Sequence, residues 1–205
     1  MIRFLFITIL IIICFGCAST NLTSFVDPQV KNKQYKKVMV YFPSSDLDEQ
    51  TKGEDILKEE FLENRINAYR SLDFFLPTRE YSDNEIMKIL INNDVDAVLL
   101  VEFVDAYTDQ SYVPQSNTTT TKGQVTAYGN TARYKENSKT YSYGGYYINK
   151  PRIKFISKLI DVNEDIVAWI GSSLTKGNAY AGFGTLISSL GSNIVEDLLE
   201  KKLLK

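Results

Sequence analysis

The chain has 205 residues, of which 44% are hydrophobic, 23 are basic and 25 are acidic. This length suits one domain with a sizeable core. Because there is no basic excess to attract a phosphate backbone, we expect no nucleic-acid partner. The sequence has no histidine, and its two cysteines, Cys14 and Cys17, lie near the amino terminus. Histidine is the commonest general base and metal ligand, so we expect a non-catalytic protein without a metal or other cofactor.

The amino terminus has the pattern of a secretory signal over residues 1–16. Arg3 precedes an almost unbroken apolar run over residues 4–15, which is shorter than the roughly 20 residues of a membrane-spanning helix. Gly16 and Cys17 follow, and this pair resembles the bacterial lipobox. The resemblance implies cleavage before Cys17, which then carries a diacylglyceryl group and a further acyl chain such as palmitate. A simple signal peptide or an uncleaved anchor is the alternative.

The residues after Cys17 predict where the anchored protein lies. Ala18, and not an aspartate, follows the cysteine, which in enteric-type sorting points to the outer membrane. No acidic cluster, which in some phyla marks export to the cell surface, follows Cys17. We therefore expect a lipoprotein of the bacterial outer membrane that faces the periplasm. Residues 17–35 are polar without a clear period and predict a tether.

Four segments beyond residue 35 have the patterns of alternating strands and helices. They are a strand over residues 38–42, an amphipathic helix over 54–69, a strand over 72–76 and a helix from Ser82 to residues 92–94. Ser82 and Glu85 have the spacing of a capping box, in which each side chain bonds the other residue's backbone N–H. This order predicts helices that pack on a sheet.

The rest of the chain predicts the centre of that sheet and a last helix. The expected elements are a strand over residues 97–104, a hairpin of strands over 152–162 and 166–175, and an amphipathic helix over 185–204. The first of these lacks polar alternation, as is typical of a central strand covered on both faces. Trp169 is expected to pack under a helix. The sequence thus predicts an α/β (α+β) domain over residues 36–205, with a mixed β-sheet and helices packed on it.

Three segments resemble a group of envelope lipoproteins. They are Lys37 to Phe42, Asp96 to Glu102 (DAVLLVE) and Lys158 to Gly171 (KLIDVNEDIVAWIG). The pattern resembles the periplasmic domain of the curli-secretion channel lipoproteins, the amino-terminal domain of the Tol-system propeller protein, and related uncharacterised lipoproteins. In such families the third segment is a hairpin, whose pattern is matched here by Asp161, Val162, Val167, Trp169 and Gly171. The resemblance implies a fold and a scaffolding role, and it brings no catalytic residues.

Residues 107–150 form an insertion that is rich in tyrosine and threonine. Eight of the 13 tyrosines of the chain lie in it. A structureless loop of this length is uncommon in a compact domain and often functional, and tyrosine is favoured at recognition surfaces. The candidate partner-binding residues are Tyr112, Tyr128, Tyr134, Tyr141, Tyr143, Tyr146 and Tyr147. The alternative is a solvated β-hairpin whose tyrosines pack on one another or on the sheet.

Other candidate sites have simpler interpretations. The glycine-rich segment 177–185 precedes a helix but lacks a Walker lysine, so it predicts a permissive turn more than a phosphate site. Four acidic residues near one strand have no histidine beside them, which argues against a metal or acid–base site. They are Asp94, Asp96, Glu102 and Asp105. Ser172 and Ser173 lack the histidine of a hydrolase triad.

The sequence leaves three functions open. The first is a non-catalytic, lipid-anchored scaffold or assembly factor that binds another envelope protein. The second is a lipoprotein that binds a small ligand or a glycan with the tyrosine-rich insertion. The third is a subunit of a secretion pore, as in the curli-type proteins. The insertion lacks the apolar alternation over about 9–11 residues per strand that a membrane-spanning hairpin requires, so we expect the first function.

Overall fold

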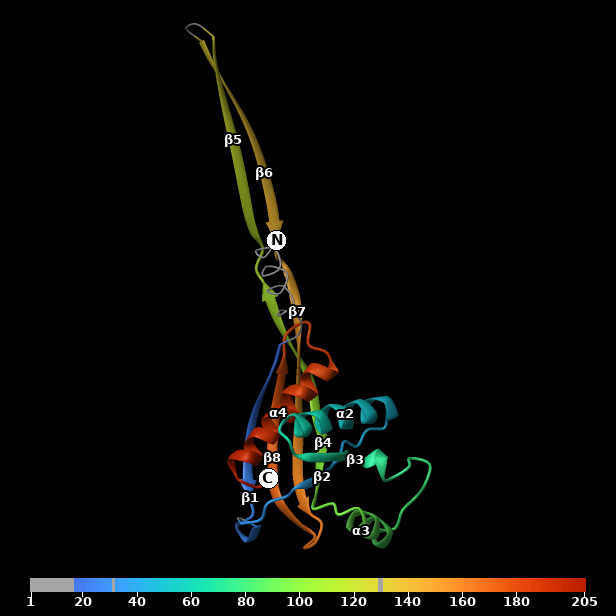
Figure 1. Cartoon of the computed structure of the whole chain (residues 1–205). Coiled ribbons are helices and arrows are strands. Elements are labelled where there is room, and N and C mark those ends of the chain that lie inside the picture. The colour runs from blue at the N-terminus through green and yellow to red at the C-terminus, as the bar shows by residue number, and fades with distance from the viewer. Residues whose placement is uncertain (1–16, 31, 129–130) are drawn as a thin grey trace, which may run out of the picture. The chain divides into compact units, whose positions relative to one another are not determined.

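The structure is a computed structural model that describes residues 17–30, 32–128 and 131–205 (Figure 1). The predicted signal over residues 1–16 lies outside the described part. The described strands are β1 (Ala18–Val26), β2 (Lys37–Tyr41), β3 (Asn67–Arg70), β4 (Ala97–Val113), β5 (Ser116–Tyr128), β6 (Thr131–Tyr143), β7 (Tyr146–Asp161) and β8 (Ile166–Gly177). The described α-helices are α2 (Leu47–Glu63), α3 (Asp83–Asn92) and α4 (Phe183–Glu200).

These elements form the α+β fold that the sequence predicts. Within the described residues, six strands make one sheet in the order β1-β8-β7-β4-β2-β3, and β5 and β6 make a second sheet. The large sheet is mixed, because β2 is parallel to β3 and β4, whereas β8 is antiparallel to β1 and β7. No described helix is long and apolar enough to cross a membrane.

The chain divides into two compact units. One, here called the body, combines the described residues up to Asp109 with Lys150–Lys205. The other, here called the hairpin unit, is Gln110–Asn149. The predicted insertion over residues 107–150 covers the hairpin unit. β4 and β7 each contribute residues to both units, so the insertion is continuous with two strands of the main sheet.

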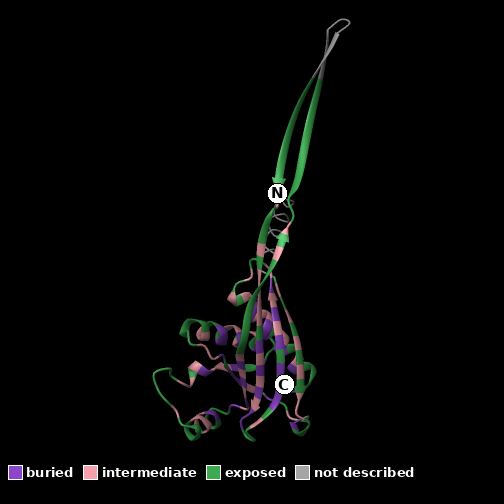
Figure 2. Ribbon diagram, turned by 180° about the vertical axis from the view of Figure 1, so that it is seen from behind, coloured by how far each residue is buried: buried purple, intermediate pink, exposed green. Residues whose placement is uncertain are grey.

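The main core of the body lies between one face of the sheet and the helices α2 and α4. Figure 2 shows buried residues alternating with more exposed ones along the strands of the body. Fully buried members come from every layer: Val38, Val40, Leu57, Phe61, Leu99, Val101, Leu159, Trp169, Ile187, Leu190, Ile194 and Leu198. Gly191 lets the helices approach closely, because a Cβ there would lie 3.2 Å from the side chain of Leu57. A smaller core formed by Met39, Leu90, Val95 and Val162 lies on the opposite face of the sheet. Successive side chains of a strand point to opposite faces, so the strands contribute to both cores.

The predicted tether over residues 17–35 is wrong for its first half. Ala18–Val26 is the edge strand β1, which pairs with β8 from Ala18 opposite Gly177 to Val26 opposite Trp169. Leu22 and Val26 pack against the main core. The strand escaped prediction because polar residues also face inward. Thr20 Oγ1, for example, lies 2.9 Å from Thr175 Oγ1 and 3.0 Å from Ser189 Oγ of α4.

The predicted helix over residues 54–69 and strand over 72–76 are also wrong in their bounds. α2 begins at Leu47, because the Asp46 carboxylate accepts hydrogen bonds from two backbone N–H groups of the first turn. The helix ends at Glu63, and Arg65, with φ of 64°, turns the chain toward β3. Ile66 and Tyr69 therefore belong to the turn and the strand, although their spacing suits a helix. Residues 71–73 then form a 3₁₀ turn, not a strand.

Several local predictions are confirmed. Ser82 and Glu85 form the capping box of α3, with Ser82 N donating to Glu85 Oε2 over 2.9 Å. β4 lies between β7 and β2 in the sheet. β7 and β8 form the predicted hairpin around a turn at residues 162–165. Trp169 is fully buried, and its indole Nε1 donates to Asp197 Oδ2 of α4 over 2.7 Å.

Asp161, which matches the lipoprotein hairpin pattern, has a structural role. Its Oδ1 accepts from the backbone N–H groups of Asn163 and Glu164, at 2.9 Å each, and so shapes the turn. Its Oδ2 accepts from Lys33 Nζ at 2.7 Å and Tyr35 Oη at 3.0 Å. Burial raises the pKa of Asp161, but these hydrogen bonds outweigh it and hold the pKa below its ordinary value.

Candidate functional site

Cys17, the predicted lipidation site, is exposed at the beginning of an edge strand. Its carbonyl oxygen accepts a hydrogen bond from Asn178 N over 2.9 Å, and the next residue, Ala18, is already paired with Gly177. The backbone at Cys17 is therefore fixed to the turn after β8, while the thiol is accessible. A group attached to this sulfur would be joined to the sheet without an intervening flexible segment.

The described candidate tyrosines are exposed, and all lie in the hairpin unit. Tyr112, Tyr141, Tyr143, Tyr146 and Tyr147 have exposed fractions between 43% and 70%. The rings of Tyr112 and Tyr147 lie 5.1 Å apart, and those of Tyr143 and Tyr146 lie 6.2 Å apart. Tyr146 Oη also donates to Tyr143 Oη over 3.1 Å. The predicted alternative of tyrosines that pack on one another thus applies to these two pairs, which still present their rings to solvent.

The β5–β6 hairpin presents two different faces. Hydroxyl groups pair across the strands on one face, with Thr119 Oγ1 3.0 Å from Thr140 Oγ1 and Thr121 Oγ1 3.1 Å from Ser138 Oγ. Tyr141 and Tyr143 occupy the alternate positions of β6 and so belong to the other face. That face has a depression of about 410 Å³ lined by Thr120, Lys122, Asn137, Lys139 and Tyr141. One face of the hairpin therefore carries the paired hydroxyls, whereas the other carries Tyr141, Tyr143 and the groups that line the depression.

Two of the candidate tyrosines lie outside the part whose side chains are described. The backbones of Tyr128 and Tyr134 pair with Thr131 and Val125, close to the end of the hairpin.

The glycines that connect β6 to β7 adopt left-handed backbone angles, with φ of 93° at Gly144 and 77° at Gly145. A Cβ at Gly144 would lie 2.1 Å from the carbonyl oxygen of Pro114, so glycine is required there.

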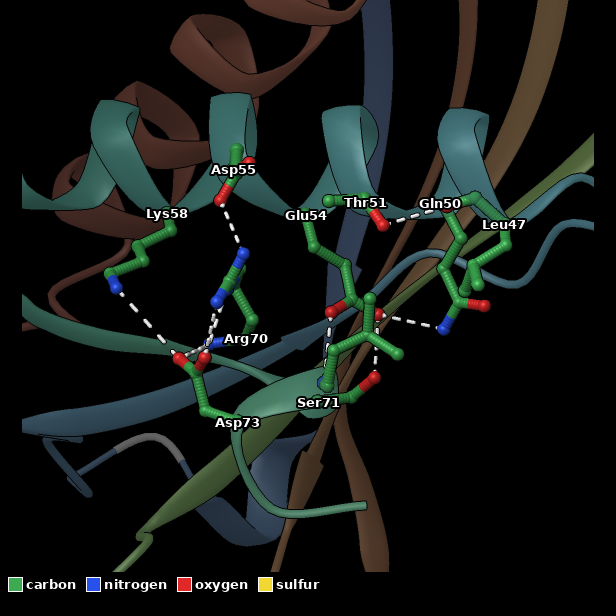
Figure 3. Close-up of polar contacts among 10 residues, drawn as sticks. Leu47, Gln50, Thr51, Glu54, Asp55, Lys58, Arg70, Ser71 and Asp73 are labelled. Carbon is green, nitrogen blue, oxygen red and sulfur yellow. Dashed lines mark hydrogen bonds and ion pairs between the residues drawn. The ribbon is translucent and has the colours of Figure 1, made fainter. Parts of the chain in front are cut away.

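A buried carboxylate that sequence reasoning missed lies under α2 (Figure 3). Glu54 is completely buried. Its Oε1 accepts from Ser71 Oγ at 2.5 Å, Gln50 Nε2 at 3.2 Å and Phe42 N at 3.4 Å, and its Oε2 accepts from Leu72 N at 3.1 Å. Four donors compensate the cost of burying the charge. Glu54 thus joins α2, the end of β2 and the segment after β3.

A second polar cluster fastens the same segment further along α2, toward the end of the helix (Figure 3). Arg70 contacts Asp73 at 2.6 Å and Asp55 at 3.0 Å, and Lys58 lies 3.8 Å from Asp73. The hydrogen bond with Asp73 raises the pKa of Arg70. These groups are partly exposed, so each pair contributes little stability by itself. Together with Glu54 they determine where the chain leaves β3.

Next to this network lies an apolar pocket of about 420 Å³. Its lining comes from β2, α2, the segment Ser71–Tyr81, α3 and β4: Met39, Tyr41, Gln50, Ser71, Leu72, Phe75, Leu76, Pro77, Arg79, Tyr81, Ile86, Leu90 and Val98. Gln50 and Ser71 are the two side chains that also bind Glu54. No local pattern marks these residues in the sequence, because they come from five separate segments.

The remaining candidates have structural partners. Asp96 Oδ2 accepts from the backbone N–H groups of Lys36 and Lys37, at 2.8 and 3.0 Å, and so positions the start of β2. Glu102 pairs with Lys158 at 2.7 Å, and Asp105 lies 3.6 Å from Lys154. Asp94 is a turn residue with φ of 53°. Among the described residues, no cysteine or acidic side chains are grouped so that they could hold a metal.

The glycine-rich turn and the serine pair show no arrangement for chemistry. A Cβ at Gly177 would lie 2.6 Å from Ala181 Cβ and 2.9 Å from Pro151 Cγ, so glycine at this position serves close packing. Ser172 is exposed on β8, while Ser173 is buried and its Oγ has no hydrogen-bond partner among the described residues. These two neighbouring side chains point to opposite faces of the strand.

No protein-family model and no curated protein matches this chain. Among solved structures, the PelC dodecamer from Paraburkholderia phytofirmans in space group P6 is similar. It has 14% identity, covers 91% of this chain and 99% of that chain, and gives a TM-score of 0.48. A single-residue variant of the same dodecamer has 12% identity, covers 88% and 98% of the two chains, and also gives a TM-score of 0.48.

Proposed function

We propose that this chain is a non-catalytic, lipid-anchored envelope protein that binds another envelope component through its hairpin unit. The observation that carries the proposal is the exposure of the hairpin tyrosines, between 43% and 70%. A two-stranded ribbon is marginally stable in water unless an apolar face is covered. Exposed rings on such a ribbon supply contact area at low entropic cost, which favours a partner that covers them.

The hairpin also offers its backbone to a partner. Within the described residues, β5 and β6 pair only with each other. Each strand therefore has an outer edge whose N–H and C=O groups have no strand partner, and such edges accept an additional strand. Tyrosine rings on one face and free backbone groups at the edges together suit a protein that adds a strand and covers the rings.

The anchor is part of the proposal and rests on Gly16 and Cys17 together with the exposed position of Cys17. Acylation of this sulfur would hold the start of β1 at a membrane, since more than one acyl chain gives a stable attachment. We propose that this membrane is the outer membrane and that the protein faces the periplasm. The residue after the cysteine, Ala18, supports this address.

Site-specific photocrosslinking in living cells tests the binding surface. A photoreactive phenylalanine replaces Tyr141 or Tyr143, and the same group at Tyr180 serves as the control, because Tyr180 is 82% exposed but belongs to the body. We expect one discrete protein adduct from each hairpin position and none from the control. Adducts from the control position alone, or no adduct from either hairpin position, would contradict the proposal.

An envelope glycan is the second candidate partner. The depression beside Tyr141 favours it, because Lys122, Asn137 and Lys139 place hydrogen-bonding groups next to an aromatic ring. Sugars offer hydroxyls to such groups and an apolar ring face to tyrosine. The same crosslinking experiment separates the two candidates: glycosidase treatment returns a glycan adduct to the mobility of the uncrosslinked protein, whereas it leaves the mobility of a protein adduct unchanged.

A further inference from the structure

The pocket beside Glu54 has the size and the walls of a ligand site. Its volume of about 420 Å³ falls in the range of about 300–1,000 Å³ that is typical of small-molecule pockets. Most of the lining is aliphatic or aromatic: Met39, Leu72, Phe75, Leu76, Pro77, Ile86, Leu90 and Val98. Met39 and Leu90 are buried members of the small core. The floor of the pocket is thus part of the packed interior of the body.

The segment that borders the pocket is held to α2 at one end and packs on itself at the other. At one end, Ser71 and Leu72 donate to the buried carboxylate of Glu54. At the other end, the Tyr81 ring lies 5.3 Å from the Phe75 ring in an edge-to-face arrangement, and Tyr81 Oη accepts from Leu76 N over 3.1 Å. A wall held in this way forms a site before a ligand arrives, which lowers the entropic cost of binding.

One charge lines this apolar space. Arg79 is the single charged residue of the lining, and neither an aspartate nor a glutamate is among the lining residues. In the described part of the chain, its guanidinium has no ion pair, whereas that of Arg70 contacts two carboxylates and that of Arg152 contacts Asp109. Glu54 lies behind Gln50 and Ser71 and already accepts four hydrogen bonds. The cation at this pocket is therefore available to an external anion.

We infer that this pocket binds a single-chain anionic amphiphile. The alkyl chain would lie against Met39, Ile86 and Val98, and the anionic head group would contact Arg79. Guanidinium groups bind carboxylates and phosphates with two parallel hydrogen bonds, which suits either head group. The inference rests on the body alone and does not depend on the anchor or on the hairpin unit.

Methionine methyl NMR on the full lipidated chain in phosphatidylcholine nanodiscs tests this inference. Met39 lines the pocket, and Met87 packs against the neighbouring small core, so their methyl groups report on the site. Octanoate and octyl phosphate are the probes, and octanol is the neutral probe of equal chain length. We expect a saturable shift of the Met39 methyl with at least one anionic probe. The anion that binds more tightly identifies the head group as a carboxylate or a phosphate.

The Arg79→Gln variant shows whether the charge matters. A hydrogen bond to a charged group corresponds to roughly a ten- to hundredfold change in affinity. We expect Arg79→Gln to weaken binding of the anionic probe by this factor and to leave octanol binding unchanged. Lys88→Gln is the matched control, because Lys88 is an exposed cation of α3 outside the lining. Equal affinity for octanol and the anions, no Met39 shift, or an unaffected Arg79→Gln variant would overturn the inference.

Discussion

Replacement of Trp169 by alanine should be among the most damaging substitutions in this protein. The side chain is fully buried, and its Nε1 donates to Asp197 Oδ2 over 2.7 Å. The ring also lies against Gly171 of the same strand, where a Cβ would approach it to 2.6 Å, and the hydrogen bond to Asp197 joins β8 to α4. Large-to-small replacements of this kind cost about 3–5 kcal/mol. We expect about 5 kcal/mol, the upper end of that range, because the half-buried Asp197 carboxylate also loses its donor.

The measurement is urea unfolding followed by far-ultraviolet circular dichroism. With an m-value of about 2 kcal/mol/M, a loss of about 5 kcal/mol lowers the midpoint by about 2.5 M. Trp169→Phe keeps most of the apolar contact and loses the hydrogen bond, so it should lower stability by about 2 kcal/mol. Tyr180→Ala is the control for a merely exposed ring and should change stability by less than about 0.5 kcal/mol. A Trp169→Ala midpoint equal to that of the parent, or red-shifted native tryptophan emission, would refute the reasoning.

Three further substitutions test the anchor, the hairpin and the turn. Cys17→Ala should abolish labelling with a fatty-acid analogue, and unchanged label would contradict lipidation at this residue. Replacing residues 111–148 with a short Gly/Asn turn should leave a cooperative unfolding transition with a similar midpoint, since the cost of loop closure grows only as the logarithm of loop length. The same variant should no longer capture the partner. Asp161→Asn should cost about 1–3 kcal/mol at neutral pH, and urea midpoints should converge with those of the parent below about pH 3.8. The sign follows from the lowered pKa of Asp161. A carboxyl whose pKa is lower in the folded than in the unfolded protein stabilises the fold at any pH above its unfolded-state pKa, and this contribution is lost as the pH falls through the folded-state pKa.

Much of the body could be predicted because its elements have long, regular patterns. α4 buries an apolar residue at nearly every inward position, and buried and more exposed residues alternate along β7 and β8. Ser82 with Glu85 marks the start of α3 in the sequence itself. The bounds of α2 could not be predicted in the same way. Ile66 and Tyr69 continue the helical spacing of the preceding residues, yet the left-handed backbone at Arg65 separates them from the helix. Periodicity alone does not detect one residue of unusual backbone conformation.

β1 and the apolar pocket could not be predicted, for two different reasons. In β1, Thr20 faces inward and satisfies its hydroxyl with Thr175 and Ser189, so a polar residue occupies a position that a strand pattern assigns to an apolar one. The pocket is assembled from segments distant in sequence, and Arg79 occurs in a polar stretch that has no pattern of its own. The Arg79 guanidinium is available to an external anion because no acidic side chain lines the pocket beside it, and a single sequence does not show which side chains are neighbours in space.

The edge strand changes what an acyl group on Cys17 would do. A polar tether of nearly twenty residues would let the domain move over a wide range of distances and orientations. Here β1 begins one residue after the cysteine and pairs with β8 along its whole length. Leu22 and Val26 of that strand also pack against the core, so β1 cannot detach without cost. Acylation would therefore fix one end of the main sheet at the membrane, and the exposed Tyr180 in the turn bound to Cys17 would lie at the same end.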